Sequence, residues 1–221
     1  MKRILIGFLV LCLVVWSSSC ASMGKKEKTG ATVGATAGAV AGALIGKGAA
    51  GTIFGALLGA AVGGAAGAYI GKYMDKQAAE MRQDLQGAKV ERIGEGIKIT
   101  FDSGLLFDAG KSDLRDVSRQ NLDSLATILN KYPDTNILIE GHTDSTGTRE
   151  QNLVLSERRA GSVGHYLAQR NVAAGRFSEM GYGPDQPIAT NDTPEGRQQN
   201  RRVELAVIAN EKLKEEAKAK G

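Results

Sequence analysis

The sequence predicts an α/β (α+β) sandwich of βαβαβ order in its second half, preceded by a helical hairpin. Three observations support this fold class. Short runs of alternating apolar and polar residues, typical of half-buried strands, recur between residues 89 and 208. Longer stretches with apolar residues at helical spacing separate these runs. Glycine recurs at every fourth position between residues 30 and 72. The 221 residues suffice for one ordinary domain with attachments.

The first 19 residues have the features of a lipoprotein signal peptide. Two basic residues precede an apolar run, residues 4–16, which is too short to span a bilayer. Small residues then lead into Cys20, as in the lipobox of bacterial lipoproteins, although Ser17 stands where leucine is usual. We expect cleavage before Cys20 and lipidation of this cysteine. Secretory cleavage that leaves Cys20 free is the alternative. Ala21, in place of an aspartate, favours the outer membrane.

Residues 20–29 form a linker to a segment, residues 30–72, with a regular glycine pattern. Its two series are Gly30, Gly34, Gly38, Gly42 and Gly46, then Gly51, Gly55, Gly59, Gly63, Gly67 and Gly71. A spacing of four keeps these glycines on one helical face. A glycine inside a helix costs roughly 1 kcal/mol relative to alanine. The stripe is therefore favourable where close backbone packing compensates, as between membrane helices.

We expect residues 30–72 to form a glycine-zipper helical hairpin in the membrane. Residues 31–46 and 52–71 would make helices of about 24 Å and about 30 Å, beside a hydrocarbon core roughly 30 Å thick. Two spans return the chain to its starting side, so the lipid and the folded domain would share the periplasmic face. The stripe also allows self-association into a homo-oligomer. A flexible Gly/Ala tether is the alternative.

Residues 73–88 are polar and helix-favouring, and they predict a helical connector. Its apolar stripe consists of Met74, Ala78, Met81 and Leu85. We interpret this segment as a stalk or connector, because it precedes the first strand of the folded domain, residues 89–208. A charged tail, residues 209–221, follows the domain, and we expect it to be frayed.

The domain begins with two alternating strands joined by a turn at residues 94–96. A helix follows, with Ser112 as its N-cap and Pro133 as its stop. The apolar face of this helix comprises Leu114, Val117, Leu122, Leu125, Ile128 and Leu129.

Residues 135–144 predict a strand, and residues 149–171 predict a second helix. Residues 176–183 predict a strand or turn, and residues 201–209 predict the last strand. Three residues of the second helix are expected to face the core: Leu155, Val163 and Leu167.

The stretch that follows the 135–144 strand lacks the features of a catalytic or metal site. It has no serine or cysteine in a recognisable nucleophile elbow. His142 and Asp144 would share one face of an extended strand, but further metal ligands at suitable spacing are missing. His165 fits a helix surface, and acids such as Asp102 and Asp113 are a weak signal for hydrolysis. We therefore expect neither an enzyme nor a bound metal or cofactor.

The same stretch suits ligand binding. Asp144 can accept hydrogen bonds from an ammonium, and Arg159 offers a planar fork for a carboxylate. Asn152, Leu155 and Arg159 lie at helical spacing, which favours Arg159 over its neighbour Arg158. A ligand that carries both an amine and a carboxylate fits this pair. In the alternative, Asp144 caps the turn that follows it.

Three segments resemble the OmpA-like peptidoglycan-binding domain family: FDSGLLFDAGKSDL, IEGHTDSTGTREQNLVLSERRAGSV and GYGPDQPIATNDTPEGRQQNRRVEL. With the lipobox and the glycine pattern in front, the chain resembles YiaD-type outer-membrane lipoproteins. The resemblance implies meso-diaminopimelate of the peptidoglycan stem peptide as the ligand. It places the ligand aspartate at Asp144 and the ligand arginine at Arg159. Further positions of the implied site are Thr143, Asn152, Leu155, Arg201, Phe107 and Asp108.

The expected function is a tether between the outer membrane and the cell wall. Peptidoglycan and outer-membrane lipid are the expected partners, and a net charge of +4 does not demand nucleic acid. One alternative is an envelope assembly or stress factor that acts through glycine-zipper oligomerisation and binds the wall only as an anchor. A wall hydrolase is less consistent with the sequence, because nucleophile and metal motifs are missing.

Overall fold

The computed structural model describes residues 62–220. The predicted signal peptide (1–19), the lipidation site Cys20, the linker (20–29) and the predicted hairpin as far as residue 61 lie outside the described residues. Between residues 62 and 220, no helix combines the length and the apolar character needed to cross a membrane. The described part covers the end of the predicted hairpin, the connector and the domain.

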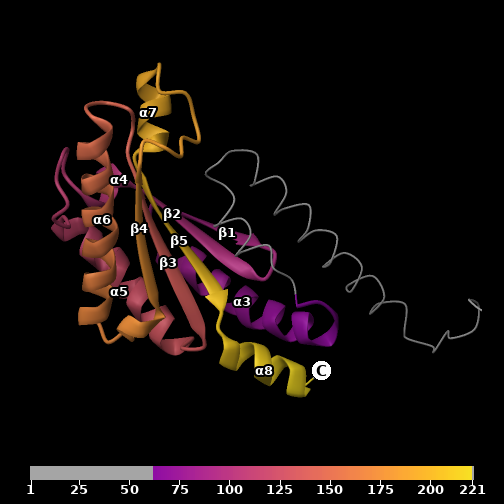
Figure 1. Ribbon diagram of the computed structural model, residues 1–221. Helices are drawn as coiled ribbons and strands as arrows, with labels where there is room; N and C mark the ends of the chain where they lie inside the picture. The colour runs from indigo at the N-terminus through magenta and orange to yellow at the C-terminus, as the bar shows by residue number, and fades with distance from the viewer. Residues whose placement is uncertain (1–61, 221) are drawn as a thin grey trace, which may run out of the picture.

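A five-stranded mixed sheet forms the centre of the domain (Figure 1), with the order β1-β2-β5-β3-β4. The strands are β1 (Ala88–Ile93), β2 (Gly96–Asp102), β3 (Thr135–His142), β4 (Phe177–Gly183) and β5 (Arg202–Ala209). Neighbouring strands are antiparallel except β3 and β4. Parallel neighbours need a crossover connection, which here contains α6 (Arg149–Gln169).

Helices α5 (Asp116–Lys131), α6 and α3 (Gly64–Asp84) share one apolar core with the sheet. Strand residues that face this core, such as Ile99, Ile139 and Leu205, are fully buried. Alternate strand residues point the other way, and there polar side chains such as Glu140 and Glu204 lie opposite each other in register. The predicted α+β class is confirmed, with the predicted hairpin β1–β2 as an addition at one edge of the sheet.

Three short helical elements have no counterpart among the predicted elements: α4 (Ser103–Leu106), a 3-10 turn (Ala174–Arg176) and α7 (Pro194–Asn200). Side-chain caps stabilise two of them, because their first backbone N–H groups lack helical partners. Asp102 accepts from the backbone N–H of Gly104 in α4, and Thr193 accepts from that of Gly196 in α7. Helices α4 and α7 follow β2 and precede β5, so they flank the sheet end that carries the candidate site.

The predicted start of the first domain helix, at Ser112, is wrong. Helix α5 begins at Asp116 with Arg115 as its N-cap, because the preceding residues form another structure. Phe107 and Leu114 pair in an isolated antiparallel bridge, and the backbone N–H of Arg115 donates to Leu106. Val117 was expected in the core, but it is 54% exposed.

The predicted connector is not a free stalk. Helix α3 packs on β1, α5 and α8 (Glu211–Lys220), and its side chains Ile70, Met74 and Met81 are fully buried. The apolar stripe of the connector is therefore confirmed, whereas its interpretation as a stalk is wrong. The helix begins at Gly64, so it continues from the end of the predicted hairpin segment without a break at residue 72.

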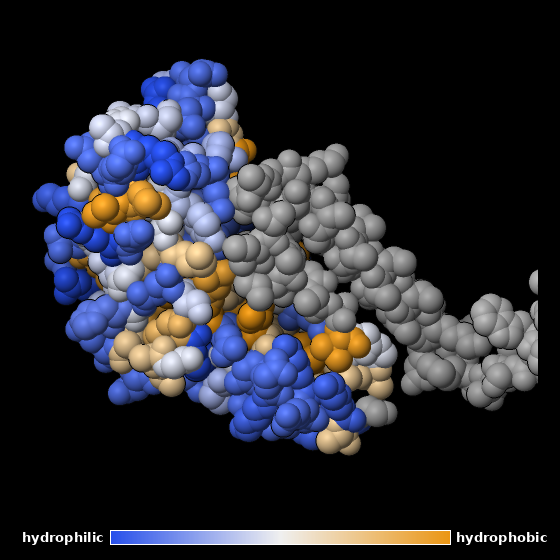
Figure 2. Space-filling model, in the orientation of Figure 1, coloured by the Kyte–Doolittle hydropathy of each residue, from blue (hydrophilic) through white to orange (hydrophobic). Residues whose placement is uncertain are grey.

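The charged tail is also ordered, contrary to the expectation of a frayed end. Residues 211–220 form α8, which buries Leu213 and Ala217 against α3. The Nζ atom of Lys220 donates to the hydroxyl of Tyr69 at 2.9 Å, which joins the end of α8 to the start of α3. In Figure 2 the outward side of α8 is hydrophilic, as its lysine and glutamate content requires. Two apolar side chains at a spacing of four were enough to dock this helix.

The packing of α3 generates a stability prediction. Met74→Ala removes a fully buried side chain, and we expect it to lower the free energy of unfolding by about 2–5 kcal/mol. Lys76→Ala, at an exposed position of the same helix, should change it by less than about 0.5 kcal/mol. Urea unfolding of the full chain, followed by circular dichroism, measures both. Equal, small effects of the two substitutions would mean that α3 stands free of the domain.

Candidate functional site

The loop after β3 folds back onto the first turn of α6. The backbone N–H of Thr143 donates to Gly183, which ties the loop to the end of β4. The backbone N–H of Thr146 donates to Asp144 Oδ1 at 2.9 Å, and Asn152 Nδ2 donates to the Thr146 carbonyl at 2.8 Å. Asn152 therefore holds the loop in place, and Asp144 lies inside it. Asp144 therefore also caps the turn that follows it, which was the alternative role, through the hydrogen bond from Thr146.

Asp144 forms a partly buried ion pair with Arg201. Arg201 Nη1 donates to Asp144 Oδ2 at 2.5 Å, and the aspartate side chain is 10% exposed. Burial by itself raises the pKa of the Asp144 carboxyl, but the hydrogen bonds from Arg201 and Thr146 outweigh this effect. The pKa therefore lies below its ordinary value of 3.8, and Asp144 is an anion at neutral pH.

Arg159 enters the same site from α6. It is 4% exposed, and its Nε donates to the carbonyl of Lys111 at 2.9 Å. Its Nη2 reaches the carbonyl of Asp108 at 3.5 Å, and its guanidinium lies 5.1 Å from the ring centroid of Phe107. The 107–111 loop therefore forms a wall beside this arginine. The exposed neighbour, Arg158, is excluded from the site, as helical spacing predicts.

The electrostatics place Asp144, Arg159 and Arg201 in one site. Burial lowers the pKa of Arg159, the charge of Arg201 lowers it further, and the charge of Asp144 raises it. The guanidinium nevertheless stays charged at neutral pH, because an arginine pKa starts from 12.5. The ion pair of Asp144 is formed with Arg201, not with Arg159. Asp144, Arg159 and Arg201, which are all among the predicted site positions, thus place one anion and two cations in the same region.

Several predicted site residues contribute differently from the expectation. The carboxylate of Asp108 lies near Lys111 and Arg115, and only its backbone carbonyl reaches Arg159. Leu155 is half-buried on α6. Thr143 donates its hydroxyl to the Asp144 carbonyl at 3.0 Å, so it shapes the loop.

The sequence analysis misses Gln198 as a residue of this region. Arg201 Nη2 donates to Gln198 Oε1, and Gln198 Nε2 donates to Asp102 Oδ2. Gln198 lies one helical turn before Arg201 in α7, a spacing that would have pointed to this contact. Arg201 is therefore held between Asp144 and Gln198.

His142 and Asp144 do not share a face, although two positions on an extended strand would. Strand β3 ends at His142, and Asp144 belongs to the loop. His142 stacks on Tyr182 with the ring centroids 5.6 Å apart. It lies beside Glu140 and Glu204, and the potential ligand atoms of these three buried residues are within 4.8 Å of one another. Arg202 and Lys98 both form ion pairs with Glu204, which disfavours a metal cation there.

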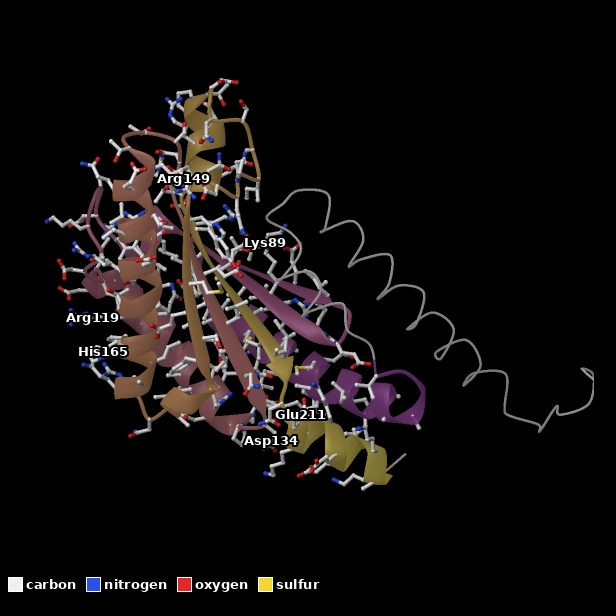
Figure 3. All side chains as sticks on the ribbon, in the orientation of Figure 1. Lys89, Arg119, Asp134, Arg149, His165 and Glu211 are labelled. Atoms are coloured by element: carbon white, nitrogen blue, oxygen red, sulfur yellow. The ribbon has the colours of Figure 1, made fainter. Side chains whose placement is uncertain are left out.

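The placement of the Asp144 loop beside α6 depends on a close approach of β3 to α6 at Gly141. A Cβ atom at Gly141 would lie 2.1 Å from the Ser156 carbonyl oxygen. Glycine is therefore required where the strand crosses the helix backbone. Figure 3 shows Arg149, at the start of α6, at the upper end of the sheet, which is also the end at which β3 leads into the Asp144 loop.

A family comparison agrees with this geometry. The model of the OmpA family matches residues 106–201, which contain the Asp144 loop, Arg159 and Arg201. A peptidoglycan-associated lipoprotein from Brucella suis biovar 1 is 36% identical over 53% of this chain and 70% of its own length. The chain belongs to the OmpA family. A second model, the YMGG-like Gly-zipper, matches residues 1–75 of this OmpA family member.

Two further relatives define the extent of the similarity. The probable lipoprotein YiaD from Escherichia coli (strain K12) is 38% identical over 60% of this chain and 62% of its own length. The chain thus spans about three fifths of that relative. Among solved structures, the cell wall anchor of the T6SS from Pseudomonas aeruginosa is 31% identical, with a TM-score of 0.55. That likeness covers 62% of this chain and 97% of the anchor structure.

The close approach at Gly141 generates a second prediction. Gly141→Ala should lower the free energy of unfolding by about 1–3 kcal/mol or more, because the added methyl group would overlap the backbone oxygen of Ser156. Gly161→Ala, on the same helix contact surface, places its methyl group 3.5 Å from Glu179, an ordinary contact. It should be neutral or stabilise by up to about 1 kcal/mol through helix propensity. Urea unfolding distinguishes the two variants, and a neutral Gly141→Ala would contradict the strand–helix contact.

Proposed function

We propose that this protein is an outer-membrane lipoprotein that binds peptidoglycan non-covalently and tethers the outer membrane to the cell wall. The ligand is the diaminopimelate of the stem peptide. The observation that carries this proposal is the convergence of Asp144, Arg159 and Arg201 in one site. Asp144 and Arg159 are held in place by the fold, so these two charges are organised before the ligand arrives.

Diaminopimelate suits this charge arrangement because its side chain ends in a second amine-and-carboxylate centre. Asp144 is positioned to accept from the ammonium, and Arg159 to donate to the carboxylate. Asp144 Oδ1 is occupied by Thr146, whereas Oδ2 bonds Arg201, whose side chain is 36% exposed. Because each carboxylate oxygen can accept two hydrogen bonds, the entering ammonium either bonds a remaining lone pair of Asp144 or displaces Arg201 from Oδ2. A displaced Arg201 is free to pair with the ligand carboxylate.

Two relatives support the same partner through their names. One is a peptidoglycan-associated lipoprotein, and one of the similar structures is a cell wall anchor. A site of this kind favours binding over hydrolysis, since a general acid needs a pKa near the working pH. The pKa of Asp144 is shifted in the opposite direction, below its ordinary range. We therefore propose a binding protein without catalytic residues.

The N-terminal half supplies the membrane side of the proposed tether. We propose that Cys20 carries the lipid anchor and that the part of the glycine-rich segment before α3, residues 30–63, associates with the membrane as a glycine zipper. The match of residues 1–75 to the YMGG-like Gly-zipper supports a separate module here. It also favours the second candidate function, an assembly or stress factor that oligomerises through this segment and uses the wall as an anchor.

Substitution of either Asp144 or Arg159 should abolish wall binding. Asp144→Asn keeps the shape of the side chain but removes its charge, and Arg159→Lys keeps the charge but removes the planar fork. Loss of one partner of a desolvated charge contact typically costs about 2–5 kcal/mol, or roughly 30- to 5,000-fold in affinity. Sedimentation of the full chain with purified diaminopimelate-type peptidoglycan measures the loss.

Arg158→Ala is the matched control, because Arg158 is the exposed neighbour of Arg159. This variant should sediment with the wall as the unaltered protein does. Circular dichroism establishes that each variant is folded. Wall binding that survives in both Asp144→Asn and Arg159→Lys would rule out this site, as would equal binding of the unaltered protein to lysine-type walls.

A deletion separates the two candidate functions. If the protein is a tether, removal of residues 30–63, which ends before α3, should leave wall binding unchanged and should not alter its crosslinking pattern. If the zipper oligomerises, the full chain should form crosslinked multimers in membranes that the deletion variant lacks. Chemical crosslinking followed by gel electrophoresis records the outcome.

A further inference from the structure

A second group of charged side chains lies on the sheet face opposite the core helices. Glu140 and His142 project from β3, and Arg202 and Glu204 project from β5. The register places Glu140 opposite Glu204 and His142 opposite Arg202. Their exposed fractions are 2%, 1%, 4% and 4% in the order Glu140, His142, Arg202 and Glu204. These four residues form a buried charge cluster that the proposed wall-binding function does not use.

Of the two carboxylates in this cluster, Glu204 has both basic side chains as ion-pair partners. Arg202 Nε donates to Glu204 Oε1 at 2.7 Å, and Lys98 Nζ reaches the same oxygen at 2.9 Å. The ion-pair partner recorded for Glu140 is the Nε2 atom of His142, 3.6 Å away. Neither ring nitrogen of His142 has a hydrogen-bond partner in the structure of residues 62–220. A buried carboxylate thus faces another carboxylate across the strands, which is unfavourable while both are charged.

We propose that Glu140 and His142 form a compensating proton pair that keeps the stability of the domain nearly constant between about pH 5 and pH 7. The folded domain takes up one proton at Glu140 on acidification. The unfolded chain takes up one proton at His142 over the same range. Because both states gain about one proton, the free energy difference between them changes little.

The direction of each effect follows from burial. Burial raises the pKa of Glu140 from 4.5 to about 7, and the facing charge of Glu204 adds to this, against Arg202 and Lys98. Glu140 therefore contributes stability that is present below pH 4.5 and is lost as the pH rises through 7. Burial, with Arg202, lowers the pKa of His142 from 6.5 to about 3. His142 contributes stability that is present above pH 6.5 and is lost as the pH falls towards 3.

The other groups that face this pair keep their charge state between about pH 5 and pH 7. From β5, Glu204 has a lowered pKa in spite of its burial, because Arg202 and Lys98 favour its charged form. From β4, burial and Glu140 raise the pKa of Tyr182 above 10.0, so it stays neutral. Arg202 also donates to the carbonyls of Gln186 and Asn200, which fixes its position. The pair Glu140 and His142 therefore dominates proton exchange within the cluster.

The test is urea unfolding of the full chain between pH 7 and pH 5, with Glu140→Gln, His142→Asn and the double variant. The folding equilibrium constant of the unaltered protein should change by less than about threefold. That of Glu140→Gln should fall more than about tenfold on acidification, because the histidine effect is no longer opposed. That of His142→Asn should rise more than about tenfold, and the double variant should resemble the unaltered protein.

Parallel profiles for the unaltered protein and both single variants would overturn the proposal. Should a single variant fail to fold, nitrogen NMR of His142 in the unaltered protein decides, since the ring must remain neutral at pH 5. A protonated ring at that pH contradicts the pair. The same unfolding experiment with added zinc or with EDTA tests whether these residues form a metal site instead. Stabilisation by zinc that Glu140→Gln abolishes would replace the proton pair with a metal site.

Discussion

The ion pair between Asp144 and Arg201 is the interaction on which the candidate site depends. A carboxylate that is 10% exposed needs a cation, and Arg201 supplies it from the residue that precedes β5. The pair joins the loop after β3 to the end of α7, two segments that are far apart in the sequence. It therefore organises the site. Arg159 is held separately, by carbonyls of the 107–111 loop.

Two charge systems lie next to each other where β3 ends and β5 begins. Arg201, which precedes β5, pairs with Asp144, whereas Arg202, the first residue of β5, pairs with the buried Glu204 on the face away from the core helices. On the β3 side, His142 is the last strand residue and belongs to the buried cluster, whereas Asp144 belongs to the loop that follows. Adjacent arginines thus have different partners, Asp144 in the loop and Glu204 in the sheet.

The sequence predicts the strands well because their alternating pattern reflects burial on a single face, and the resemblance points to Asp144 and Arg159. It fails at the start of α5, where a bridge between Phe107 and Leu114 uses residues that have helical spacing. It also fails to predict that α3 and α8 dock on the domain, because each helix buries its apolar residues against elements distant in sequence. The contacts that hold Arg159 could not be predicted, because they use the backbone carbonyls of Asp108 and Lys111, which every residue type has.

The two ends of the sheet give the domain a mechanical direction. Helix α8 leaves β5 at the end where the Asn210 backbone N–H donates to Asp134, and α3 begins beside α8. Asp134 and Glu211 mark this end in Figure 3, and Asp144 follows β3 at the other end. A force applied between the start of α3 and the Asp144 loop therefore runs along the strands. Such a load shears many backbone hydrogen bonds at once instead of opening them one after another.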